Sequence, residues 1–241
     1  MGWSTKPMQS VSPQYEAEEK ITVNGNVDLY AVVFNRTTET DLTEDQLPQV
    51  DIYKYKQVIF VGDSRTEFME NVLTGMGESA TKNVKFVCSA GKGLDWFTTT
   101  GWAQLYSIVQ HDSNSILSKK TAVIFNFGVN DLSKSADYAE YYNWIAPQLK
   151  SKGCELYFMS VNPVNRLMLP NAGRADRSEA AVRSFNQYMK ANLSSAYTYI
   201  DMYSYLKSTG YSFASDHYGT GTVDDGLHYT TRTYKLSLIH I

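Results

Sequence analysis

Five short apolar runs, separated by longer stretches of helical periodicity, constrain the fold of this chain more than any other feature. Most of the runs are almost continuously apolar, as strands buried on both faces of a sheet must be. Strands that alternate with helices predict a parallel, doubly wound α/β sheet with helices on both faces. The runs are residues 58–61, 84–87, 122–127, 156–161 and 197–200.

Two of the intervening stretches carry apolar side chains at the spacing of an amphipathic helix. We interpret both stripes as faces that pack on the sheet, within a five-stranded, flavodoxin-like domain that spans residues 51–241. In such a sheet the ligand site lies beyond the carboxyl ends of the strands. The stripes are Tyr138, Tyr141, Tyr142, Ile145 and Leu149, and Ala181, Phe185, Tyr188, Met189 and Leu193.

Residues 1–50 have a different composition from the rest, being polar and rich in Thr, Glu, Asn and Gln. They hold one strand candidate, residues 27–33, which follows the tight-turn pair Asn24-Gly25. We therefore expect a short N-terminal β extension and a linker ahead of the main domain.

Composition excludes several classes of protein. Of the 241 residues, 43% are hydrophobic and 20% are charged, which is typical of a globular chain. The formal net charge of −3 leaves no basic excess for nucleic acid, and no apolar run is long enough for a transmembrane segment. Cys88 and Cys154 are too few for a disulfide framework, and no cluster of His, Cys and carboxylates has metal-ligand spacing. We expect a monomer with no metal and no cofactor.

Polar residues that can carry chemistry follow the first and third apolar runs. Ser64, in Gly62-Asp63-Ser64-Arg65, falls on a strand-to-helix turn that would direct its hydroxyl into the crevice. Alternatively, Ser64 caps the following helix. Asn130, in Gly128-Val129-Asn130-Asp131, could donate a hydrogen bond to a developing oxyanion, or could simply form a turn.

Two further blocks complete a possible catalytic set. Gly91-Lys92-Gly93 follows the second run, where a glycine N–H could complete an oxyanion hole, although such a pair is also common in plain loops. Asp225 precedes His228 by three residues, close enough to hold the imidazole in one tautomer. A serine nucleophile needs such a base, and the base needs an orienting group. The alternative is a polar loop with an incidental histidine.

In chain order, these four blocks resemble those of the SGNH (GDSL-type) hydrolases, over residues 57 to about 235. The resemblance implies that Ser64 is the nucleophile, His228 the general base and Asp225 the residue that orients it. It also implies an oxyanion hole built from the Ser64 N–H, the Asn130 side chain and the N–H of Gly93, with Gly91 as the alternative. The implied reaction is acyl transfer in two steps, without a metal or cofactor.

The substrate is less constrained, because the family includes carbohydrate acetylesterases, lipases and thioesterases. We take Arg65, Asp95, Trp96 and Asn162 as candidate substrate-binding residues, since aromatic faces with polar neighbours suit a sugar. Trp96 could equally belong to the core. These residues favour a small acyl ester, above all acetyl, on a carbohydrate. The alternatives are a lipid esterase or thioesterase, and a non-catalytic glycan-binding surface module on the same fold.

Both ends of the chain look truncated. Residues 1–34 resemble the C-terminal half of an internalin B-type surface repeat, through Gly2-Trp3 and the strand at 27–33. The resemblance implies a piece of a longer bacterial protein that is secreted or displayed on the cell surface, whereas a native polar extension is the alternative. Residues 237–241 end where a family member would continue through a full helix, so we expect that helix to be cut short.

Overall fold

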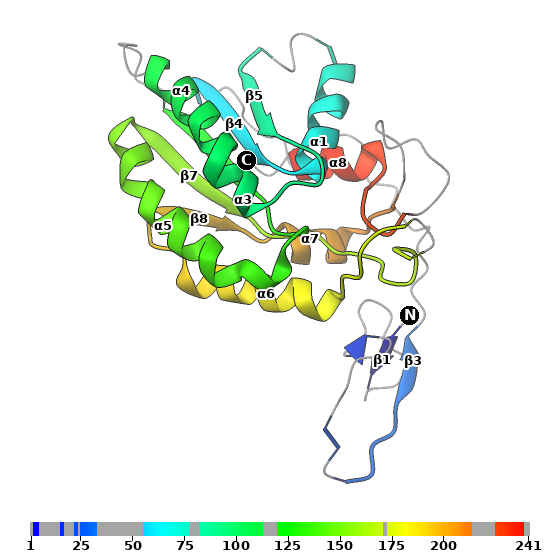
Figure 1. Ribbon diagram of the computed structural model, residues 1–241. Helices are drawn as coiled ribbons and strands as arrows, with labels where there is room; N and C mark the ends of the chain where they lie inside the picture. Colours follow the sequence, from blue (N-terminus) through cyan, green and yellow to red (C-terminus); the bar gives the residue numbers. More distant parts are fainter. Residues whose placement is uncertain are drawn as a thin grey trace.

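A five-stranded parallel sheet forms the main body of the protein, with the strand order β5-β4-β6-β7-β8 (Figure 1). Every strand falls on one of the five apolar runs, and this order is the flavodoxin-like one, so the predicted doubly wound sheet is confirmed. The strands are β4 (Gln57–Gly62), β5 (Val84–Cys88), β6 (Thr121–Asn126), β7 (Cys154–Met159) and β8 (Tyr197–Ile200). The computed structural model describes residues 2–4, 15–16, 22–23, 25–32, 55–77, 82–112, 120–170, 173–213 and 225–238.

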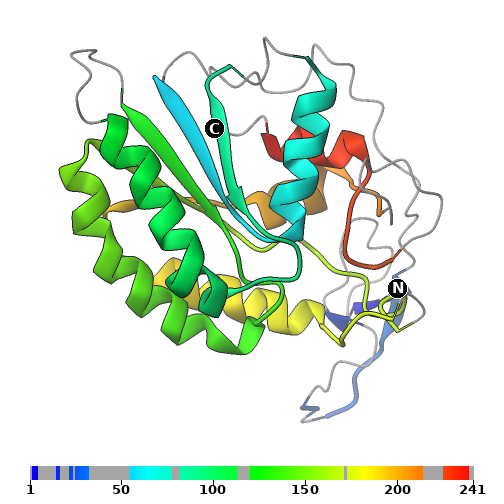
Figure 2. The same ribbon diagram turned by 45° about the horizontal axis from the view of Figure 1, so that its top comes forward.

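Helices cover both faces of the sheet. Successive side chains along a strand point to opposite faces, so apolar strands give the sheet two apolar faces to bury. Ile59 and Val61 of β4 face a core shared with three helices, whereas Val58 and Phe60 face a second core with three others (Figures 1 and 2). The first set is α4 (Trp102–Asp112), α5 (Ser135–Ser151) and α6 (Glu179–Asn192), and the second is α1 (Ser64–Gly75), α7 (Met202–Thr209) and α8 (Thr231–Leu238). Shorter helical turns are α3 (Leu94–Trp96), η3 (Phe97–Gly101) and η4 (Leu132–Lys134).

The two predicted helical stripes lie on α5 and α6. Four of the five side chains of the α5 stripe are fully buried, and Tyr141 is partly buried. On α6, Phe185 and Met189 are buried, but Tyr188 is 39% exposed, so its predicted core position is wrong. Helical spacing from Phe185 and Met189 instead places Val182 on the buried face.

The N-terminal residues form a small antiparallel sheet with the order β2-β1-β3. The predicted strand at 27–33 is shorter than expected, because it begins at Tyr30. Residue 33 and the proposed domain boundary near residue 50 lie outside the described residues. The strands are β1 (Gly2–Ser4), β2 (Tyr15–Glu16) and β3 (Tyr30–Val32).

At the other end of the chain, an eight-residue helix, α8, does follow His228 and packs against α1. The aromatic rings of Phe68 and Tyr234 stack between these two helices, with centroids 5.8 Å apart. Residues 239–241 lie outside the described residues, so the expectation that this helix is cut short stays a prediction. In the described part of the chain, no helix has the length and apolar character needed to cross a membrane.

Candidate active site

The turn from β4 into α1 places Ser64 at the carboxyl edge of the sheet. Asp63 caps this helix, since its Oδ1 accepts a hydrogen bond from the Arg65 N–H at 3.0 Å. Ser64 is therefore the first helical residue and not the cap, which leaves its hydroxyl available. The N–H groups of a first helical turn have no acceptor within the helix, and the helix N-terminus favours negative charge.

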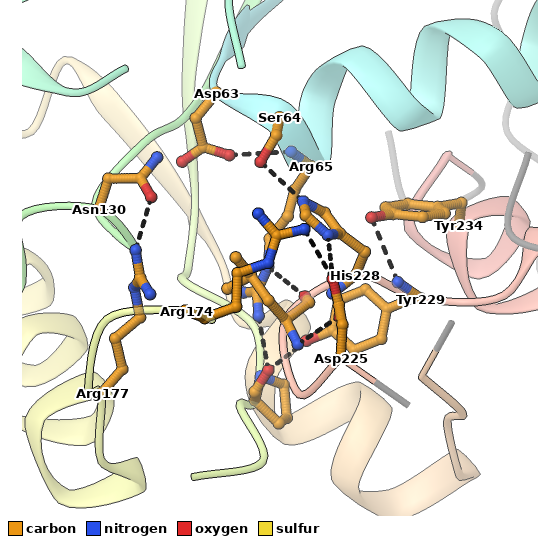
Figure 3. A network of polar contacts seen from close by, with 12 residues as sticks. Asp63, Ser64, Arg65, Asn130, Arg174, Arg177, Asp225, His228, Tyr229 and Tyr234 are labelled. Atoms are coloured by element: carbon orange, nitrogen blue, oxygen red, sulfur yellow. Dashed lines mark hydrogen bonds and ion pairs between the residues drawn. The ribbon is translucent and has the colours of Figure 1, made fainter. Parts of the chain in front are cut away.

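A hydrogen-bonded chain joins the three predicted triad residues (Figure 3). The Oγ of Ser64 lies 2.9 Å from Nε2 of His228, and Nδ1 of that ring lies 2.6 Å from Oδ2 of Asp225. The other oxygen of Asp225, Oδ1, accepts the N–H of Leu227 at 2.9 Å and the N–H of His228 at 2.8 Å. Gly226, between the acid and the base, has a φ of +73°, the left-handed conformation that favours glycine. All three triad side chains are buried.

Burial and charge give the two partners of Ser64 complementary protonation states. Burial lowers the pKa of His228, and although Asp225 opposes this, the charges of Arg65 and Arg174 lower it further. Burial raises the pKa of Asp225, but the hydrogen bonds from His228 and Leu227 outweigh it, so that pKa is lowered overall. At neutral pH the ring is uncharged, with a proton on Nδ1 held by the carboxylate. Nε2 can then accept the Ser64 proton, which is the arrangement of a general base.

The Asp63 carboxyl has an unusual environment for a residue next to a nucleophile. Burial raises its pKa to about 6, against the opposing effects of the Arg65 N–H and the Arg65 charge. Its Oδ2 is buried, and the part of the chain that the structure describes gives it no hydrogen-bond partner. A carboxyl with an unsatisfied buried oxygen is costly to keep ionised. This group therefore titrates just below neutrality, next to Ser64 in the chain.

The end of β6 holds the glycine block in place. The Nδ2 of Asn130 donates to the Lys92 carbonyl at 2.9 Å, and the Oδ2 of Asp131 accepts the Leu94 N–H at 2.9 Å. Gly93 lies between these two anchored residues. A Cβ at this position would fall 2.3 Å from the Asp131 carboxylate, so a larger residue would displace the group that accepts the Leu94 N–H. Gly91 has a φ of +70° and open space around it. Gly93 therefore lies in a more firmly anchored part of the loop than Gly91, and its role as the oxyanion donor stays a prediction.

Arg65 does not take up the predicted position of a substrate ligand. Its guanidinium is buried and donates to the carbonyl oxygens of Leu227, Asn162 and Pro163 at 2.8–3.0 Å. The same group lies 4.9 Å from the centroid of the Tyr229 ring, in a cation–π contact. These contacts tie the segment after β7 to the segment that carries His228. The structure thus corrects the predicted role of Arg65 to one in holding the site together.

The other predicted substrate-binding residues also have contacts within the protein. Asp95 is exposed and forms an ion pair with Lys134 at 2.9 Å. Trp96 packs against the core, with its ring 6.1 Å from that of Phe127, so the alternative of a core tryptophan is favoured. Asn162 is buried, and its Oδ1 has no hydrogen-bond partner among the described residues. Asn162 thus remains the candidate among these three with a buried polar atom left to satisfy.

Arg174 and Arg177, in the segment between β7 and α6, also contact the site, although no sequence motif predicts that they do. The Nη2 of Arg174 donates to Oδ2 of Asp225 at 3.1 Å, and the Nη2 of Arg177 donates to Oδ1 of Asn130 at 2.9 Å (Figure 3). They lie about 50 residues from these partners along the chain, so spacing could not reveal the contacts. The sequence offers one weak indication of these contacts, namely that the segment following β7, at the carboxyl edge of the sheet, is rich in charged residues.

The described residues contain no group of three or more His, Cys, Asp or Glu side chains that could hold a metal ion. Cys88 and Cys154 are both free thiols. Of the other three histidines, His111 belongs to α4, and those at 217 and 240 lie outside the described residues.

The parallel sheet and the helices on its two faces form the α/β fold typical of SGNH hydrolases. The GDSL-like Lipase/Acylhydrolase family matches residues 58–241, and the chain belongs to this family of ester-hydrolysing enzymes. A search of curated proteins found no match.

Solved structures with this fold share little sequence with the chain. A Bacteroides fragilis protein proposed to be an acylhydrolase is 18% identical, with a TM-score of 0.49 over 80% of this chain and 87% of its own. The catalytic domain of Streptococcus pneumoniae peptidoglycan O-acetyltransferase A is 16% identical, with a TM-score of 0.43 over 76% and 88%. The psychrotrophic esterase EstA of a Pseudoalteromonas species is 10% identical, with a TM-score of 0.43 over 75% and 91%.

Proposed function

We propose that this protein is a serine esterase that removes small acyl groups, above all acetyl, from carbohydrate esters through a Ser64–His228–Asp225 triad. The observation that carries the proposal is the hydrogen-bonded chain from Ser64 Oγ to a neutral His228 and on to an ionised Asp225. A serine hydroxyl becomes a competent nucleophile when such a base accepts its proton and an acid orients the base.

In the first step, Ser64 Oγ attacks the ester carbonyl carbon while its proton passes to Nε2 of His228. The carbonyl oxygen becomes an oxyanion, which the N–H groups of Ser64 and Gly93 and the amide nitrogen of Asn130 stabilise. Asp225 stabilises the imidazolium that forms. The imidazolium then gives its Nε2 proton to the leaving alcohol, the C–O bond breaks, and Ser64 keeps the acyl group.

In the second step, water takes the place of the alcohol. Nε2 of His228 removes a proton from this water, and the resulting hydroxide attacks the acyl carbonyl of the intermediate. The same donors stabilise the second oxyanion. The bond to Ser64 Oγ then breaks, Oγ recovers a proton from His228, and the carboxylic acid leaves.

Burial around the nucleophile supports a small acyl group. Ser64 is only 6% exposed, and the ring centroids of Phe68 and His228 lie 4.4 Å apart, so an aromatic side chain packs directly against the base. Two polar residues beside the site reach the surface, since Lys92 is exposed and the Arg174 side chain is 40% exposed. Polar surroundings of this kind suit the hydroxyl-rich alcohol portion of a carbohydrate ester.

We also propose that the natural protein acts as a monomer outside the cytoplasm, on the resemblance of residues 1–34 to a surface repeat. Fractionation of the source cells tests the location, and finding the protein only in the cytoplasm would contradict it. Light scattering of the purified chain tests the oligomeric state.

The test of function compares the hydrolysis of 4-nitrophenyl acetate and 4-nitrophenyl octanoate by the native protein and by Ser64→Ala. We expect a higher kcat/KM for acetate, and a loss of at least about 10³-fold in kcat in the variant. Release of acetate from acetylated xylan then tests the carbohydrate portion. A preference for octanoate would indicate a lipid esterase or thioesterase, and glycan binding without turnover by folded protein would indicate a binding module.

A further inference from the structure

The side-chain amide of Asn130 lies between two groups of opposite hydrogen-bonding character. Its Nδ2 is 2.9 Å from the Lys92 carbonyl oxygen, and its Oδ1 is 2.9 Å from Nη2 of Arg177. A carbonyl oxygen only accepts hydrogen bonds and a guanidinium only donates them. A rotated amide would set its NH₂ group against the guanidinium and its oxygen against the Lys92 carbonyl. Only one of the two amide orientations therefore satisfies both neighbours.

Arg177 is itself held firmly enough to impose this choice. Its Nε donates to the Val129 carbonyl at 2.6 Å, and its Nη1 donates to the Ala175 carbonyl at 2.9 Å. With the bond to Asn130, all three nitrogens of the planar guanidinium are engaged. A planar fork that is fixed at three points presents its donors in one direction. The cation cannot swing away without losing contacts to both the β6 end and its own loop.

The orientation matters because the Asn130 amide nitrogen carries two hydrogens and the Lys92 carbonyl takes only one. Figure 3 shows this nitrogen on the side that faces Asp63 and Ser64, with the oxygen turned toward Arg177. We infer that Arg177 is a positioning residue, which locks the amide so that an N–H and not an oxygen meets the developing oxyanion. The positive charge at Oδ1 also polarises the amide and strengthens its N–H as a donor.

The inference rests on the proposed role of Asn130 in the oxyanion hole, and it predicts a specific kinetic signature. Loss of an oxyanion donor lowers kcat by about 10²–10³-fold. Arg177→Gln leaves the donor present but free to rotate, so we expect a smaller fall in kcat, about 10-fold. KM should change by less than about twofold, because the donor acts on the transition state and not on the bound ester.

A double-mutant cycle with Asn130→Ala separates this role from a structural one. We expect Arg177→Gln to lower kcat in the native background and to have no further effect once Asn130 is alanine. Additive losses in the double variant would overturn the inference, because they would mean that Arg177 acts by another route. Should Asn130→Ala not fold, Asn130→Asp serves, since it keeps a partner for Arg177 but has no N–H to donate.

The failure of the inference and the failure of the proposed function give different results. If Asn130→Ala lowers kcat but Arg177→Gln does not, only the positioning role of Arg177 is refuted. If Asn130→Ala leaves kcat unchanged, the oxyanion role of Asn130 is refuted, and the positioning role with it. Arg183→Gln is the matched control, because this arginine lies on α6 and hydrogen-bonds Tyr203. It should keep the native kcat, and melting temperatures of all variants confirm folding.

Discussion

Replacing Asp225 with asparagine should nearly abolish activity while leaving the shape of the site intact. Oδ1 of Asp225 accepts two main-chain N–H groups, at 2.9 and 2.8 Å, so the oxygen of an asparagine must take that place. Its NH₂ group then occupies the position of Oδ2, which is 2.6 Å from Nδ1 of His228. Because this NH₂ group is a donor, Nδ1 of His228 must be unprotonated to accept from it, and the ring then carries its proton on Nε2. In that tautomer it cannot accept the proton of Ser64.

The size of the effect follows from the cost of the wrong tautomer. To recover the base, the amide would have to rotate and set its NH₂ group against the N–H groups of Leu227 and His228. The equivalent change in a serine protease with the same triad logic lowers kcat about 10⁴-fold. We expect a loss of about 10³–10⁴-fold here, equivalent to roughly 4–5 kcal/mol of transition-state stabilisation.

The assay is steady-state hydrolysis of 4-nitrophenyl acetate at pH 7.5, with circular dichroism to show that the variant is folded. Asp176→Asn is the matched control, because this exposed carboxylate contacts the side chain of Arg166 and the main-chain N–H of Arg177, and an asparagine oxygen can still accept a hydrogen bond from either. It should retain the native kcat. An Asp225→Asn protein that is folded and keeps more than a tenth of the native kcat would refute the reasoning.

Three further predictions follow from the site. Because the pKa of His228 is lowered, kcat/KM should fall only as the pH drops through a midpoint below 6.5. The Asp63→Asn variant should show the same fall at acidic pH. If that variant loses the fall, the titrating group is Asp63 and not His228. Arg174→Gln removes a charge that lowers the pKa of His228, so the midpoint should move to higher pH, and a profile that does not move would contradict this. Gly226→Ala forces a left-handed alanine whose Cβ would lie 2.4 Å from a loop carbonyl, so we expect the melting temperature to fall by about 4–8 °C, from a cost of about 2 kcal/mol. Gly173 is also left-handed, but a Cβ there meets no atom within 4 Å, so Gly173→Ala should lower the melting temperature by less. Equal decreases in the two variants would refute the steric argument.

The sheet could be predicted because its strands obey a simple rule. The two central strands, β4 and β6, are buried along their whole length, and this burial forces the continuous apolar runs that identify them. The buried face of a helix is harder to predict, as the exposed Tyr188 shows. A large aromatic side chain at the edge of an apolar stripe fits the core and the surface equally well. The antiparallel strands β1 and β2 lie in polar sequence with no apolar period to mark them.

The candidate site divides in the same way. Ser64, Asn130, Asp225 and His228 follow strand ends or lie in short blocks, so topology alone brings them to one edge of the sheet. Arg65 was misjudged because a cation next to a nucleophile suggests a substrate contact, whereas its acceptors are carbonyl groups far away in the sequence.

Arg174 and Arg177 could not be predicted, since their partners are set by the path of a loop and not by any local pattern. Such a path depends on long-range contacts, among them the hydrogen bond from the Asn165 N–H to the Gly226 carbonyl. No periodicity in the sequence reports a contact of that kind.

The most direct test of the account is covalent labelling of the nucleophile. The protein is treated with a 4-nitrophenyl phosphonate ester, and the modified residue is located by peptide mass spectrometry. We predict one adduct per chain, on Ser64, with loss of esterase activity in proportion to labelling and no adduct in Ser64→Ala. Inactivation with the adduct on another residue, or a Ser64→Ala protein that is still labelled and active, would contradict the claim that Ser64 is the nucleophile.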